Sequence, residues 1–204
     1  MVVPGLTVTS VLVITFFLVC PTVSTPRLAN ADSSLVDSDT EVPVDCLLDA
    51  VSELENYPQV AILQFASGVM QVAHTYFENG ITFFTNLVYI AIRFCVANGD
   101  SAPFVGHNAI LRWSAIQQVG HFDEDGYEKF WSESHVSEDF DMSLRLQCDG
   151  YIVRLGAWPG CEGFKEGVSL TVYDELARWE KYAYGMPLQP PFPLQNHLLT
   201  TSRL

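Results

Sequence analysis

A pair of carboxylates directly after a short apolar run is the feature that most constrains this chain. Residues 34–36 are typical of the end of a buried strand, and Asp37 and Asp39 follow them. Open α/β sheets place ligand-binding side chains at the carboxyl ends of their strands. Carboxylate oxygens are the ligands that Mg²⁺ and Mn²⁺ prefer. The sequence therefore predicts an α/β fold with Asp37 and Asp39 as metal ligands at a strand end.

Two other kinds of site with paired aspartates do not fit this segment. In a calcium-binding EF-hand loop that starts at Asp37, the sixth position would be Gly and the twelfth Glu, but Val42 and Leu48 stand there. A strand-end phosphotransferase motif would carry Thr or Val at the fifth position, where this chain has Glu41. A solvated acidic turn stays open as an alternative to a metal site.

Two later blocks supply groups suited to a reaction at a phosphate-bearing leaving group. Glu138, Asp139 and Asp141 open a helical pattern, and carboxylates clustered in this way often mark a catalytic site. An ordinary acidic first turn of a helix, with a serine as N-cap, is the alternative. Arg178 and Trp179 lie on a later expected helix, where a guanidinium can bind a diphosphate and an indole can stack on a sugar.

Four blocks in this order resemble those of the inverting family 2 glycosyltransferases, the group with cellulose, chitin and hyaluronan synthases. The blocks are DSDTEVP (37–43), PFVGHNAILRW (103–113), SEDFD (137–141) and EGVSLTVYDELARWEKYAYG (166–185). The likeness runs over about residues 35–185 and is strongest to a fungal membrane-bound branch. It implies a partial GT-A fold of the nucleotide-diphospho-sugar transferase type, with a mostly parallel sheet flanked by helices and without most of the first nucleotide-binding half.

The resemblance also implies roles for the acidic residues. Asp139 matches the general base that deprotonates the acceptor hydroxyl, and Glu138 is its neighbour in the motif. Asp37 and Asp39 would bind the donor diphosphate through Mg²⁺ or Mn²⁺, with Arg178 as a direct contact. The reaction implied is a metal-dependent, inverting transfer from a nucleotide sugar, expected to be a UDP-sugar, to a glycan or other hydroxyl acceptor. The sequence names neither the sugar nor whether the transfer is processive.

Acceptor binding is implied for a glycine-containing segment and for one tryptophan. Phe104, Gly106, His107 and Asn108 match the acceptor-binding segment, in which Gly lets the backbone approach the sugar. Trp179 would stack on the acceptor. His107 can equally be a structural hydrogen-bonding residue.

The last block departs from the family pattern at one position. Arg178 and Trp179 match the end of the family's Q-x-x-R-W motif, but Glu175 stands where Gln is usual. A carboxylate close to a diphosphate is unfavourable, so the role of Glu175 is open.

Composition excludes one class of partner. The 204 residues carry 10 Lys and Arg against 24 Asp and Glu, a formal net charge of −14. Nucleic acids are bound through a basic surface, so we expect no nucleic-acid partner.

The five cysteines show no CxxC spacing, which favours separate thiols over a zinc site or a disulfide framework. They are Cys20, Cys46, Cys95, Cys148 and Cys161.

Hydrophobic spacing and turn residues predict alternating helices and strands. A helix should start at Pro43 and bury Val44, Leu47, Leu48, Val51 and Leu54. A helix at residues 74–97 should be a core or interfacial helix, because polar residues interrupt it, and Gly150 should end another. The expected strands are 34–36, 60–65 and 151–155, and the expected helices are 43–56, 74–97, 108–119, 137–148 and 171–184.

Three segments are expected along the chain. Residues 1–31 form a signal-like or non-homologous apolar segment, in which Ala29 to Ala31 has the small-x-small form of a cleavage site but no Lys or Arg precedes the apolar run. Residues 32–185 form the partial catalytic domain, and residues 186–204 a Pro-rich, disordered tail. The resemblance implies a membrane location, and the apolar segment a secretory route.

Three functions stay open from the sequence. The first is a membrane glycosyltransferase, which the blocks favour. The second is a catalytically inactive fragment of such an enzyme, truncated at both ends, and the comparison with the family implies little activity for it. The third is a secreted acidic binding protein, suggested by the N-terminal run alone.

Overall fold

The computed structural model of the chain describes residues 11–17, 31–37, 39–44, 46–99, 101–122, 126–131, 138–157 and 163–185. Several sequence predictions fall on other residues and stay predictions. These are the N-cap Ser137, most of the small-residue motif at 29–31, the tail 186–204, and the thiols of Cys20 and Cys161.

A mixed five-stranded sheet forms the centre of the molecule. Only β3 and β8 pair in parallel, and the other three neighbouring pairs are antiparallel. The predicted α/β class with a sheet flanked by helices is confirmed, but the expectation of a mostly parallel sheet is wrong. The strands, in spatial order, are β1 (Val11–Phe17), β2 (Ala31–Asp37), β5 (Ala109–Arg112), β3 (Val60–Phe65) and β8 (Ile152–Gly156).

Strand direction brings distant residues to one edge of this sheet. Because β5 is antiparallel to both β2 and β3, these two strands run the same way, and β8 runs with them. Their carboxyl ends therefore share an edge with the amino end of β5. Asp37 ends β2, and His107 and Asn108 immediately precede β5. The topology thus joins the first acidic block to the expected acceptor segment.

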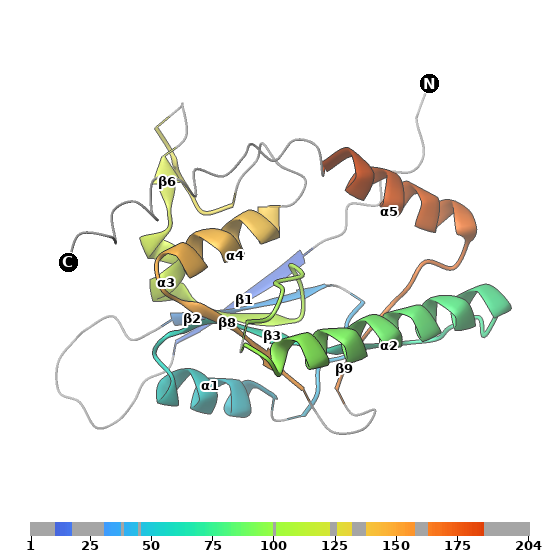
Figure 1. Cartoon of the computed structure of the whole chain (residues 1–204), viewed down its shortest axis with the longest axis horizontal. Helices are drawn as coiled ribbons and strands as arrows, with labels where there is room; N and C mark the ends of the chain where they lie inside the picture. Colours follow the sequence, from blue (N-terminus) through green and yellow to red (C-terminus); the bar gives the residue numbers. More distant parts are fainter. Residues whose placement is uncertain are drawn as a thin grey trace.

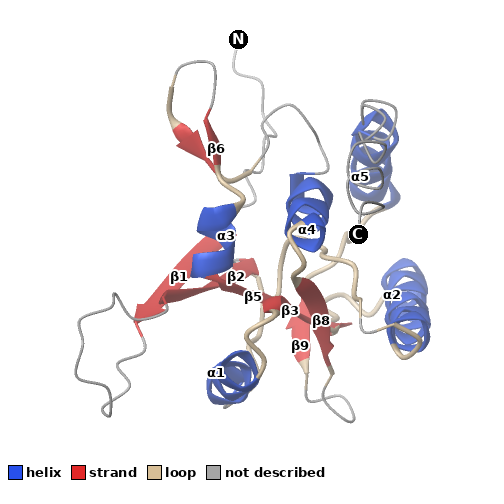
Figure 2. Ribbon diagram, turned by 60° about the vertical axis from the view of Figure 1, so that its left-hand side comes forward, coloured by secondary structure: helices blue, strands red, loops and turns tan. Residues whose placement is uncertain are grey.

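Helices cover both faces of the sheet (Figures 1 and 2). The helix α1 (Cys46–Asn56) lies on one face, and α3 (Trp113–Gln118) and α4 (Glu138–Cys148) lie on the other. Two buried apolar clusters correspond to these faces. One joins Met142 and Leu146 of α4 to the sheet, and the other joins Leu54 of α1 to Phe164.

The buried face of α1 differs from the prediction. The helix begins at Cys46 rather than at Pro43, and it buries Cys46, Ala50 and Leu54, which are spaced four residues apart. Two of these three residues are small, so the helix can pack closely on β3. Among the residues that were expected to be buried, only Leu54 is; Val44, Leu47 and Leu48 are exposed and Val51 is half-buried.

The helix expected at residues 108–119 is wrong over its first part. Residues 109–112 form β5, and the helix α3 starts only at Trp113. All four residues of β5 are buried, because this short strand lies between β2 and β3 and is covered on both faces. Residues 109–111 are a continuous apolar run, which has neither the strand period nor the helix period.

Four further elements agree with the sequence within one residue at each end. They are β3, β8, α4 and the last helix, α5 (Val172–Gly185). Gly150 ends α4 as expected, with φ +89°. The amide of Gly150 donates to the Gln147 carbonyl at 3.1 Å, and that of Tyr151 to the Leu146 carbonyl at 3.0 Å. This pair of bonds is a Schellman motif.

The helix α2 (Tyr76–Val96) is not a core helix. Only Glu78 and Tyr89 are buried along its length. The Glu78 carboxylate accepts backbone N–H bonds from residues 72–74, and these bonds lower its pKa. In the described part of the chain, α2 is the helix that is long and apolar enough to cross a membrane. The expectation of a core position is therefore corrected, whereas an interfacial position is compatible with this exposure.

Two short strand pairings complete the described fold. The strands β4 (Ser67–Val69) and β9 (Phe164–Glu166) pair in parallel beside the main sheet. The strands β6 (His121–Phe122) and β7 (Glu128–Lys129) form a small antiparallel ribbon.

The buried Arg112 at the end of β5 donates to the backbone carbonyls of Val60 at 2.8 Å and Tyr57 at 3.2 Å. It thereby fixes the chain between α1 and β3.

Candidate active site

The first acidic block lies in a tight turn that is attached to β9. The amide of Thr40 donates to the Asp37 carbonyl at 3.2 Å, which closes the turn. One residue later, Glu41 and Lys165 exchange two backbone hydrogen bonds, at 2.8 and 3.2 Å. These bonds hold Asp37 and Asp39 at the sheet edge, next to the residues that follow β9.

Asp39 lies against a glycine that follows β9. A Cβ atom added to Gly167 would come within 2.4 Å of Asp39 Oδ2. Real Cβ atoms do not approach an oxygen so closely, so the absence of a side chain at position 167 makes room for the carboxylate. Gly167 belongs to the last sequence block, which thus has a direct contact with the first.

The charges around Asp37 show which other site residues lie near it. Burial raises the pKa of the Asp37 carboxyl above its usual value. The positive charges of His107 and Arg178 oppose this rise. The negative charges of Asp39 and Glu166 add to it. The structure therefore brings Arg178 into the electrostatic environment of the DxD pair, although the two are 141 positions apart in sequence (178 minus 37).

This crowding of negative charge fits a divalent cation. Within the described residues, no group of three or more His, Cys, Asp and Glu side chains is arranged to hold a metal ion. Asp37 and Asp39 could therefore supply only part of a coordination shell, and other oxygens would have to complete it. Oxygens of a diphosphate are suited to that, because Mg²⁺ is commonly held by one or two carboxylates together with substrate phosphates.

Gly106 and Asp139 are in direct contact. Gly106 has φ +84°, a conformation that glycine adopts readily. A Cβ atom at this position would lie 2.1 Å from Asp139 Oδ2, so the carboxylate packs on the bare Cα. The structure thus brings together the expected acceptor segment and the expected general base.

His107 and Asn108 are joined through Glu166. His107 Nδ1 lies 3.0 Å from Glu166 Oε2. Asn108 Nδ2 donates to the same oxygen at 3.2 Å and to Ser67 Oγ at 2.7 Å. Burial lowers the pKa of His107, but the contact with Glu166 and the charges of Asp37 and Asp139 outweigh it, so the net pKa is raised.

Not every residue of the expected acceptor segment faces an open site. Phe104 is 2 % exposed and belongs to the core cluster under α4, where it packs against apolar side chains. Asn108 is fully buried in the network with Ser67 and Glu166. Gly106 and His107 are only partly buried. These two residues are therefore the ones among the four that are accessible to solvent.

The carboxylates in the first turn of α4 have different surroundings. Asp141 forms an ion pair with Arg145 at 2.9 Å. Arg145 also donates to the carbonyls of Phe130, at 2.5 Å, and Val119. Asp141 thus helps to fasten α4 to the segment that carries the β6–β7 ribbon. Asp139, by contrast, lies half-buried at Gly106, and Glu138 is half-buried beside it in the first turn.

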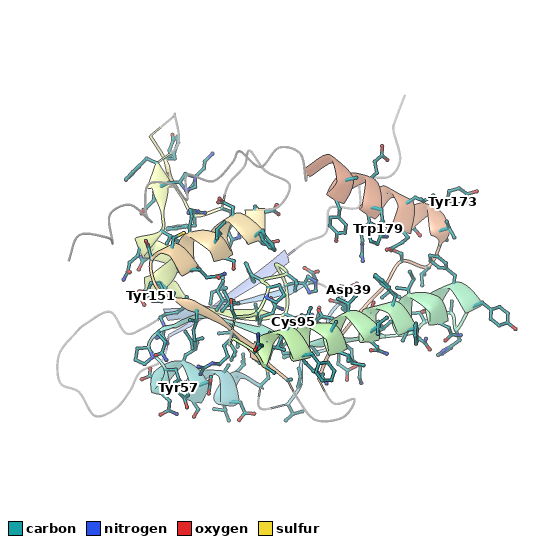
Figure 3. The ribbon with its side chains drawn as sticks, in the orientation of Figure 1. Asp39, Tyr57, Cys95, Tyr151, Tyr173 and Trp179 are labelled. Atoms are coloured by element: carbon teal, nitrogen blue, oxygen red, sulfur yellow. The ribbon has the colours of Figure 1, made fainter. Side chains whose placement is uncertain are left out.

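On α5, Glu175 is bonded to the indole that follows it by one turn. Trp179 Nε1 donates to Glu175 Oε1 at 2.9 Å. The Trp179 ring is 53 % exposed and contacts Tyr182 edge to face, with centroids 6.3 Å apart. In Figure 3, Trp179 lies on the side of α5 toward Asp39, whereas Tyr173 points away. The carboxylate at position 175 therefore orients an exposed aromatic ring.

Two residues of this site were not assigned a role from the sequence, namely Gln64 and Glu166. Gln64 is 1 % exposed in β3, and its side-chain amide bonds to the backbone of Val105, His107 and Asn108. The sequence feature that could have identified Gln64 is its position as the single polar residue in an otherwise apolar strand. Glu166 lay within a recognised block, but only the fold shows that it meets His107.

The fold and the comparison with known proteins together define the class of the chain, which is a glycosyltransferase. The model of glycosyl transferase family group 2 matches residues 34–204, which is well over half of the chain, so the chain belongs to this family. No curated protein matches it.

Proposed function

We propose that the chain transfers a sugar, with inversion, from a UDP-sugar to a hydroxyl group of a glycan acceptor. Asp37 and Asp39 would hold Mg²⁺ or Mn²⁺ at the donor diphosphate. The observation that supports this best is the contact of Asp139 with Gly106. It sets a carboxylate on a bare backbone segment that an acceptor can reach. His107, next in sequence to Gly106, lies within the electrostatic influence of both Asp37 and Asp139.

In this proposal each residue acts on a defined atom. Asp139 takes the proton of the acceptor hydroxyl while that oxygen forms a bond to the anomeric carbon. The bond from this carbon to the diphosphate oxygen breaks, and its electron pair stays on the diphosphate. Attack opposite the leaving group inverts the carbon. Arg178 donates to the diphosphate, and the exposed face of Trp179 receives the acceptor sugar.

The bound cation would neutralise charge on the leaving diphosphate. The protein supplies two carboxylates for it, so donor oxygens complete the shell. Binding of the cation and binding of the donor should therefore support each other.

The test of this function is sugar transfer by the full chain and by Asp139→Asn, with Mn²⁺ and a panel of UDP-sugars. The amide keeps the shape of Asp139 but cannot take the proton, so we expect a loss of about 10²–10⁴-fold in transfer with donor affinity nearly unchanged. Equal transfer by both proteins would contradict the role of Asp139. Tight donor binding without transfer in the unchanged chain would identify the inactive alternative.

We also propose that α2 lies on a lipid membrane surface. Its outward residues include Phe83 and Phe94, which are 70 % and 76 % exposed. Glu78 and Arg93 are the only charged residues of its 21, and Glu78 is buried, in a chain of net charge −14. An apolar stripe on a helix whose exposed charge is Arg93 alone suits an uncharged bilayer rather than a basic partner. The resemblance to membrane-bound glycosyltransferases supports the same location.

Flotation with phosphatidylcholine vesicles tests this surface. We expect the chain to float with the vesicles and the double variant Phe83→Ser/Phe94→Ser to lose about tenfold or more in partitioning, since each ring contributes ~1.5–3 kcal/mol on burial. The matched control is Phe122→Ser, because Phe122 is 75 % exposed on the β6–β7 ribbon. Equal loss in the control, or none in the double variant, would contradict the assignment of α2.

A further inference from the structure

A buried glutamine spans the backbone on both sides of Gly106. Gln64 Oε1 accepts the amide of Val105 at 3.0 Å, and Nε2 donates to the His107 carbonyl at 2.9 Å. The same Nε2 lies 3.1 Å from the Phe65 carbonyl and 3.3 Å from that of Asn108. One side chain thus fixes the residue before Gly106 and the residue after it.

The strand that carries Gln64 gives it a rigid base. All six residues of β3 are buried, and the strand pairs with β5 on one side and β8 on the other. The Phe65 amide also donates to the Asn108 carbonyl at 2.9 Å. A buried amide that is fully hydrogen-bonded specifies one arrangement of the backbone that it contacts, because any other arrangement leaves buried polar groups unpaired.

Gly106 transmits this arrangement to Asp139. The Asp139 carboxylate packs on the Cα of Gly106, so a displacement of the segment changes the space in which Oδ2 lies. We propose that Gln64 is a positioning residue for glycosyl transfer, which sets the place of the Asp139 carboxylate through residues 105–107. This proposal rests on the proposed function, in which Asp139 is the base.

The first test compares Gln64→Met with Gln117→Met in the full chain. Met has a similar length without the polar atoms, and Gln117 is an exposed residue of α3 that provides a matched control. We expect kcat to fall about 100-fold in Gln64→Met, since a misplacement of about 1 Å can cost that much, with the donor KM changed by less than about twofold. An unchanged kcat, or a rise in donor KM alone, would overturn the proposal.

The second test repeats Gln64→Met in the Asp139→Asn background. If Gln64 acts through Asp139, its removal should cost little further activity once the base is gone. The same fold-loss in both backgrounds would show that Gln64 acts by another route, and would overturn the proposal.

The third test does not need turnover. Hydrogen exchange of the Val105 amide, followed by NMR, should be at least about tenfold faster in Gln64→Met than in Gln117→Met, because the amide loses its acceptor. Unchanged exchange would overturn the positioning role even in an active enzyme. A chain without transfer but with faster exchange would contradict the proposed function and keep the structural part. Should Gln64→Met not fold, Gln64→Asn keeps the amide, shortens its reach, and takes its place in all three tests.

Discussion

At the scale of single residues, two glycines give the site its carboxylate positions. Gly106 and Gly167 come from segments about 60 residues apart, yet each has a carboxylate oxygen where a Cβ would otherwise lie. The first accommodates Asp139 and the second Asp39. The sequence indicated that Gly106 allows close approach, but it named a sugar as the approaching group, whereas in the structure a protein carboxylate already packs there.

A change at Gly167 should act on the proposed metal site through Asp39. Gly167→Ala should lower the affinity for UDP in the presence of Mn²⁺ by about 10–100-fold, the usual range for losing a group that supports a metal ligand. Isothermal titration measures this. Gly163→Ala is the control, because a Cβ there would meet nothing closer than a backbone oxygen at 3.5 Å. If both variants bind alike, Gly167 does not support the site.

The candidate site residues that the sequence predicts are those whose chemistry is visible in a short block. Asp37, Asp139 and Arg178 stood out because charged side chains recur at recognisable spacings. Gln64 and Glu166 did not, since their importance lies in contacts over 41 and 59 positions of sequence (105 minus 64, 166 minus 107). Phe104 stood out as part of a block, but its buried ring packs in the core.

At the scale of secondary structure, α5 presents two neighbouring side chains in different directions. Successive helical residues point about 100° apart. Arg178 acts electrostatically on Asp37, whereas Trp179 is held by Glu175 and keeps an exposed ring. One helix can therefore serve both the donor and the acceptor.

This geometry predicts separate effects for the two residues. Arg178→Ala should weaken UDP binding by about tenfold, because it removes a charge-assisted contact worth ~1.5–3 kcal/mol. Trp179→Ala should leave UDP binding nearly unchanged and weaken acceptor binding instead. Titration calorimetry with UDP and with an oligosaccharide acceptor separates the two. Equal losses of UDP affinity in both variants would argue against this division.

Secondary-structure prediction succeeded where residue spacing and end signals agree, and failed where a segment lacks such signals or where they mislead. The helices α4 and α5 and the strand β3 were placed within one residue, because their periodicity and end signals agree. The sequence of the four residues of β5 is compatible with a strand and with a helix. Only their pairing with β2 and β3 makes them a strand. For α1, the prediction gave the wrong start and the wrong buried face, since the helix begins three residues after Pro43.

At the scale of the whole molecule, the order of the strands creates the site. The α/β class followed from the alternation of elements, but the direction of each strand depends on partners far away in sequence and could not be read locally. The antiparallel β5 is the consequential case. It delivers the segment before β5 to the edge at which β2 ends, and so places Gly106 and His107 near Asp37.

The exposed apolar surface of α2 lies on the same side of the molecule as α5, which carries Arg178 and Trp179 (Figures 1 and 2). Tyr89, one of the two buried residues of α2, is hydrogen-bonded to Ser67, and burial raises its pKa to about 12. Ser67 in turn accepts from Asn108. The proposed membrane helix is therefore attached directly to the network that holds the proposed acceptor segment.

The proposed function requires that the edge formed by β2 and β5 binds a cation together with a nucleotide diphosphate. Calorimetric titration of Mn²⁺ into the full chain, with and without UDP, tests this requirement. We expect UDP to tighten Mn²⁺ binding at least about tenfold, since Asp37 and Asp39 would supply two carboxylates and the diphosphate would complete the shell. We expect Asp39→Ala to abolish this coupling. Mn²⁺ affinity that is the same with and without UDP, or the same in Asp39→Ala as in the unchanged chain, would contradict it.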